Sequence, residues 1–92
     1  MMTQEEVINN WRQLADWQVE TKTGQVEPFS EMRLRLTMNY LHLQAEAAFL
    51  IQQIEDVIVR LSLHRVSEIR EVVWQVLKTH GFTAEAAVYA NH

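Results

Sequence analysis

Among the side chains able to do chemistry, His42 and Glu46 have the most suggestive spacing. On a helix, residues four apart lie on one face, where an imidazole and a carboxylate can bind the same metal ion. Helical metal centres combine such residues from several facing helices, and no second His/Glu pair four apart falls within one predicted helix. We therefore interpret His42 and Glu46 as a solvent-facing pair, and we expect neither a metal nor a cofactor.

The other histidines do not predict an enzyme. None of His64, His80 and His92 has a serine, cysteine or aspartate arranged beside it as in an activated nucleophile. The chain has no cysteine, so it can form neither a disulfide nor a thiolate zinc site. We predict no catalytic residue and a non-enzymatic protein.

Three tryptophans are the next distinctive feature of the sequence. Trp11 fits the apolar face of a first helix, Trp74 lies at the edge of the apolar face of a later one, and Trp17 falls outside either face. Because exposed tryptophan is a common interface anchor, we predict that Trp17 contacts a partner. The alternative is that Trp17 is covered by the loop 23–29 or by a second copy of the chain.

The elements that must position these residues are predicted to be helices. Hydrophobic residues make up 48% of the 92 residues, and there are only two glycines and one proline. The apolar content excludes disorder, and the scarcity of turn residues argues against a β-sandwich or barrel. We predict a single all-α domain over residues 1–92.

Periodicity and capping signals set the helix boundaries, with a loop at 23–29. Thr3 and Glu6 have the spacing of a capping box. Gly24 and Gly81 suit the left-handed position that follows a helix. The predicted bundle has three main helices and a short C-terminal helical turn: about 4–22, 30–63, 67–80, and 84–89.

The central predicted helix, 30–63, is apolar on most of its circumference and contains no glycine or proline. At about 1.5 Å per residue it would be about 50 Å long. One stripe has heptad spacing, and the two flanking helices can cover it. The second stripe would stay exposed, and it comprises Leu34, Leu41, Phe49, Val59 and Leu63.

That second stripe predicts self-association, because monomers rarely expose such a strip. We expect these five residues to form the interface of a homodimer. Two alternatives stay open at this point. A different protein, within a larger assembly, could cover the stripe, or the helix could break near Asn39 or at 52–53 and fold back on itself.

Charge narrows the remaining function classes. The formal net charge is −4 and the basic residues are scattered, so nucleic acid is an unlikely partner. The charged residues of the most apolar stretch exclude a membrane span, and the N-terminus lacks the pattern of a secretory signal, which predicts a cytoplasmic protein.

The predicted function is a helical protein–protein interaction module, a small accessory, adaptor or inhibitor subunit. The alternative is a dimeric nucleic-acid-binding regulator in which symmetry joins basic residues: Arg33 with Arg35, or Arg60 with Arg65 and Arg70.

Overall fold

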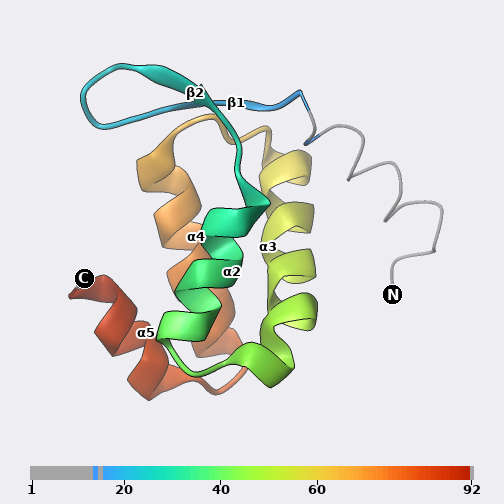
Figure 1. The fold of residues 1–92 in the computed structure, drawn as a ribbon, viewed down its shortest axis with the longest axis vertical. Helices are drawn as coiled ribbons and strands as arrows, with labels where there is room; N and C mark the ends of the chain where they lie inside the picture. The colour runs from blue at the N-terminus through green and yellow to red at the C-terminus, as the bar shows by residue number, and fades with distance from the viewer. Residues whose placement is uncertain (1–13, 15, 92) are drawn as a thin grey trace, which may run out of the picture.

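The computed structural model describes residue 14 and residues 16–91, and this part of the chain is mostly helical (Figure 1). A short antiparallel hairpin precedes the helices. The elements in chain order are β1 (Gln18–Glu20), β2 (Val26–Pro28), α2 (Glu31–Tyr40), the 3₁₀ helix η1 (Gln44–Glu46), α3 (Ala47–Leu61), α4 (Val66–Thr79) and α5 (Thr83–Ala90).

The three longest helices pack against one another between the hairpin and α5 (Figure 1). Helices α3 and α4 run antiparallel as neighbours, and α2 crosses in front of them. Helix α5 turns back beside the end of α4, and the hairpin lies at the opposite end of the bundle (Figure 1). The principal extents are 36 × 32 × 20 Å.

The core forms where α3 meets α2 and α4. Leu50, Ile54 and Ile58 are four residues apart on one face of α3, and all three are fully buried. Met38 of α2 and Val73 of α4 are equally buried. Short helices therefore enclose a core within a single chain.

The prediction of one continuous helix over 30–63 is wrong. Helix α2 ends at Tyr40 and α3 begins at Ala47. Between them, His42 has a positive φ of 60°, and the Leu43 amide donates to the Met38 carbonyl at 2.8 Å. A hydrogen bond that closes a turn of six residues, the fifth of them left-handed, is a Schellman motif, and this motif ends a helix. The chain folds back here, close to the break near Asn39 that the sequence left open.

Two further helices end in the same way. At the end of α3, Ser62 has φ 52° and the Leu63 amide donates to the Ile58 carbonyl at 3.0 Å. After α4, Gly81 has φ 89° and the Phe82 amide donates to the carbonyl of Leu77 at 2.8 Å. The predicted helices 67–80 and 84–89 are therefore confirmed to within a residue or two, as is the left-handed Gly81.

The predicted first helix, 4–22, is wrong at its C-terminal end. Residues 18–20 form β1, in which Gln18 is opposite Pro28 and Val19 is opposite Glu27. Gly24 is left-handed as expected, with φ 83°, but it lies in the hairpin turn. Pairing with β2 and burial of Val19 override the helical pattern. Residues 1–13 and 15, and with them the capping box and Trp11, lie outside the described residues.

Candidate functional site

The five predicted interface residues do not form one exposed stripe. Leu34 and Leu41 are only 7% and 5% exposed, because they belong to the chain's own core. Val59 and Leu63 are half-buried against that core. Phe49 alone is largely exposed, at 51%, and its ring meets the edge of His80 with centroids 5.0 Å apart. The fold-back after α2 separates residues that a continuous helix would have aligned.

Trp17 makes its contacts within the chain. Its indole Nε1 donates to the Leu63 carbonyl at 2.6 Å, and its ring stacks on His64 with centroids 4.4 Å apart. His64 Nδ1 lies 2.8 Å from the Gln18 carbonyl oxygen, and the Glu20 amide donates to the His64 carbonyl at 2.7 Å. We name these contacts between residues 17–20 and residues 63–64 the Trp17 clasp. It fastens the hairpin to the α3–α4 connection.

The largest exposed apolar side chains of α2 lie elsewhere than predicted. Met32, Leu36 and Tyr40 are 62%, 59% and 56% exposed, and their spacing of four places them along one side of the helix. We call them the α2 outer face. Sequence reasoning missed this face because Leu36 and Tyr40 also fit the heptad seam of a long helix. No sequence signal separates this face from a buried one, because Leu50, Ile54 and Ile58 have the same spacing of four and are fully buried.

A groove borders this face and reaches from the hairpin to α5. Its volume is about 380 Å³. Leu36 belongs both to the outer face and to the groove wall, and Arg33 on the rim pairs with Glu27 at 2.6 Å. The wall also includes apolar side chains from several elements: Val19, Phe29, Val66 and Ile69.

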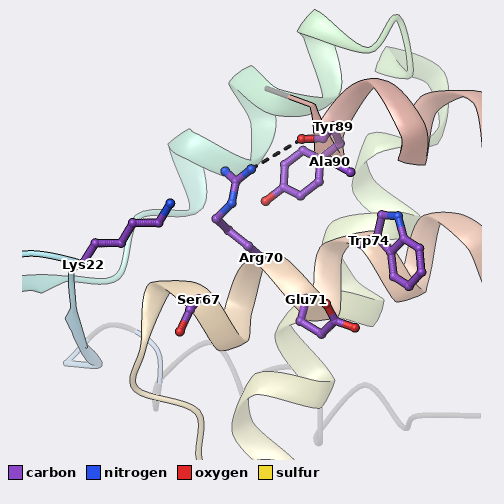
Figure 2. A pocket seen from close by; sticks show the side chains of 7 residues that line it. All are labelled: Lys22, Ser67, Arg70, Glu71, Trp74, Tyr89 and Ala90. Atoms are coloured by element: carbon purple, nitrogen blue, oxygen red, sulfur yellow. Dashed lines mark hydrogen bonds between the residues drawn. The ribbon is translucent and has the colours of Figure 1, made fainter.

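A second, more polar pocket of about 470 Å³ opens between the hairpin, α4 and α5 (Figure 2). Four of its residues come from one face of α4, at spacings of three and four, and the other three come from the hairpin and α5. We name it the α4–α5 pocket. Its lining comprises Lys22, Ser67, Arg70, Glu71, Trp74, Tyr89 and Ala90.

Arg70 and Tyr89 line both the groove and the α4–α5 pocket, so the two hollows meet there. The Arg70 guanidinium lies 4.7 Å from the centre of the Tyr89 ring, and its Nη2 donates to the Tyr89 carbonyl at 3.4 Å. Burial raises the pKa of the Tyr89 phenol, although the charge of Arg70 opposes the shift. The phenol therefore stays protonated at neutral pH. Neither Lys22 nor Tyr89 was identified from sequence. The two residues are far apart in the chain, and they meet only because the hairpin and α5 both fold back beside α4.

The basic groups of the nucleic-acid alternative are largely paired with carboxylates. Besides the Arg33–Glu27 pair, Arg35 contacts Glu31 at 3.5 Å. Arg60 forms an ion pair with Asp56. These pairs neutralise one predicted basic grouping and part of the other.

Glu55 is the buried carboxyl group of the described core, with 5% of its surface exposed. Burial is the largest of the causes that raise the pKa of Glu55 to about 8. The next two are a hydrogen bond with Glu31 and repulsion from the negative charge of Glu31. The positive charge of Arg35 acts in the opposite direction. Glu55 lines neither hollow, and within the described chain its Oε1 makes no hydrogen bond. Its place is in the contact between α2 and α3.

No metal centre emerges from the part of the chain that the structure covers, where no group of three potential ligands gathers. His42 lies in the connection after α2 and Glu46 ends η1, so they do not share a helix face. Residues 14 and 16–91 also contain no helix long and apolar enough to cross a membrane.

Comparison with known proteins adds no relative: no family model, no curated protein and no solved structure matches the chain.

Proposed function

We propose that this protein is a non-enzymatic helical interaction module that acts as a homodimer through the α2 outer face. In the cell it would serve as a small accessory, adaptor or inhibitor subunit. A cytoplasmic location is part of the proposal, and it is compatible with a sequence that contains no cysteine. The observation that carries the proposal is the alignment of Met32, Leu36 and Tyr40, each more than half exposed, on one side of α2.

Burial of this face would supply association energy. Complete burial of a large apolar side chain is worth about 1.5–3 kcal/mol. In a two-fold dimer each such residue counts twice, because the same patch is used on both copies. The adjoining groove offers a recess of about 380 Å³ for side chains of the second copy. Domains of this size gain from association, because alone they bury only about 60–65% of their unfolded surface.

The oligomeric state of matched variants tests the proposal. We expect light scattering after size exclusion to give twice 10.8 kDa for the wild type. A Met32→Glu/Leu36→Glu variant should give 10.8 kDa while its circular dichroism stays helical, because both side chains are exposed. Leu61→Glu is the matched control: Leu61 is 64% exposed, but it lies at the end of α3. This variant should remain dimeric.

Two results would reject the homodimer. One is a wild-type mass of 10.8 kDa at every protein concentration over about a tenfold range, since dimers dissociate by mass action only on dilution. The other is a dimer that Leu61→Glu disrupts as fully as the α2 variant. In that case the contact would involve the exposed end of α3.

A further inference from the structure

Two positive side chains of the α4–α5 pocket have no carboxylate partner within residues 14 and 16–91. Arg33, Arg35 and Arg60 all form ion pairs there. Lys22 and Arg70 form none, although both line the same pocket (Figure 2). Positive charges that converge on a hollow and are not neutralised by a carboxylate of the described residues are available to an anionic ligand.

Arg70 is held in a fixed position at this end of the pocket. Its guanidinium stacks over Tyr89 and uses one N–H for the Tyr89 carbonyl. A guanidinium has five N–H donors, so others remain for a ligand. The hairpin residue Lys22 extends toward Arg70 from the other side of the opening (Figure 2). The protonated Tyr89 phenol adds a neutral donor.

The other end of the pocket has a different chemistry. The Glu71 carboxylate is directed away from Lys22, and it accepts from Gln75 Nε2 at 3.4 Å (Figure 2). Trp74 is half-buried beside it, with the Lys78 ammonium 4.2 Å from the ring centre. An indole wall favours a planar ring, and a carboxylate favours an amino group.

We propose that the α4–α5 pocket binds a small organic anion: a planar ring with a carboxylate or phosphate at one end and an amino group at the other. The acidic group contacts Lys22 and Arg70, the ring packs against Trp74, and the amino group faces Glu71. The volume of about 470 Å³ lies within the range of small-molecule sites, about 300–1,000 Å³. The inference does not rest on the proposed dimer, because a single chain supplies the whole lining of the pocket, although Arg70 and Tyr89 also line the groove that the second copy would enter.

Paired probes separate the acidic group from the ring. 4-Aminobenzoate carries the carboxylate and adenosine 5′-monophosphate carries the phosphate. Aniline and adenosine are the matching rings without the acidic group. Each is titrated into the ¹⁵N-labelled full chain at constant ionic strength, up to about 10 mM, so that a Kd near 1 mM is still measurable. We expect saturable shifts at the Lys22 and Tyr89 amides and the Trp74 indole for at least one anion, and none for aniline or adenosine.

Three single variants locate the binding. Lys22→Gln and Arg70→Gln should each weaken binding of the anion about tenfold. Arg65→Gln removes the same charge from an exposed position outside the pocket, and it should leave the Kd unchanged. Arg70→Gln also removes a contact with α5, so Lys22→Gln, on the exposed hairpin turn, decides the result if the Arg70 variant loses structure.

The carboxylate and phosphate arms identify which acidic group the site accepts. The proposal is overturned if neither anion gives saturable shifts, or if the neutral rings bind as tightly as the anions. It is also overturned if Arg65→Gln weakens binding as much as Lys22→Gln, because the attraction would then be diffuse.

Discussion

At the scale of a single residue, Glu55 couples the stability of the fold to pH. Its pKa in the folded protein is about 8, against an ordinary value of 4.5. Between these two pH values the folded state holds a proton that the unfolded chain has released. The free energy of unfolding therefore falls as the pH rises from about 4.5 to about 8.

The substitution Glu55→Gln should remove this dependence. Its amide stays neutral and can still donate to Glu31, so we expect urea unfolding to show little change in stability between pH 5 and pH 8. At pH 8 the variant should exceed the wild type by on the order of 4 kcal/mol. Exposed Glu68→Gln is the control and should keep the wild-type slope. A wild-type stability that rises over this range would contradict the assignment.

At the scale of the elements, the ends of the helices decide the topology. Three helices end in Schellman motifs, whose left-handed residues are His42, Ser62 and Gly81. Each motif also brings together two apolar residues whose numbers differ by five. The pairs are Met38 with Leu43, Ile58 with Leu63, and Leu77 with Phe82. Only Gly81 has the residue type that signals such a stop. His42 is not glycine, so the sequence pattern ran through it and predicted one long helix.

Substitutions at residue 42 should report the backbone conformation directly. A left-handed conformation costs an ordinary residue about 1–2 kcal/mol, and glycine avoids that cost. His42→Gly should therefore raise the free energy of unfolding by about 0.5–1 kcal/mol, and His42→Ile should lower it by about 1–2 kcal/mol. Chemical denaturation measures both.

The control is the same type of change in a regular helix. Gln53 lies in the middle of α3, where Gln53→Gly should destabilise by about 0.5–1 kcal/mol. If glycine destabilises equally at 42 and 53, then residue 42 lies in a helix and the chain does not turn there.

The hairpin depends on the Trp17 clasp more than on its own pairing. An isolated two-stranded hairpin is marginal in water, and β1 and β2 have three residues each. Trp17→Ala removes the hydrogen bond to the Leu63 carbonyl and the stack on His64. We expect hydrogen exchange to become at least about tenfold faster at the Glu20 and Phe29 amides, through local opening of this segment.

The rest of the molecule should respond little to that variant. The amide of Val73, in the buried part of α4, should keep its protection within a few-fold, because the clasp does not contact it. Val26→Ala, on the exposed side of the hairpin, is the control and should leave the Glu20 amide protected. Uniformly faster exchange in Trp17→Ala would show that the hairpin is integral to global stability.

At the scale of the whole molecule, local signals predicted most of the helical content and long-range contacts determined the remainder. Helices 67–80 and 84–89 were predictable because periodicity and Gly81 act within a few residues. The strand at 18–20 was not, because its partners are 26–28 and the segment near His64. The α4–α5 pocket escaped prediction for the same reason: Lys22 and Tyr89 are far apart in sequence.

The interface prediction shows how one missed turn propagates. Leu34 and Leu41 were assigned to an outer surface because no other part of the chain could reach a second stripe of a 30–63 helix. Once the chain turns at His42, α3 covers α2 and both leucines enter the core. The exposed apolar surface then moves to the α2 outer face.

The Trp17 clasp also has a consequence for synthesis on the ribosome. Trp17 and the Leu63 carbonyl that its indole binds are separated by 46 positions in the chain. Residues 17–20 emerge first, yet they must wait until residues 63–64 have left the exit tunnel before they can dock. Helices α3, α4 and α5 meet partners close in sequence and can assemble as they appear. Although the hairpin is made first, it is therefore fixed in place only after α3 has emerged.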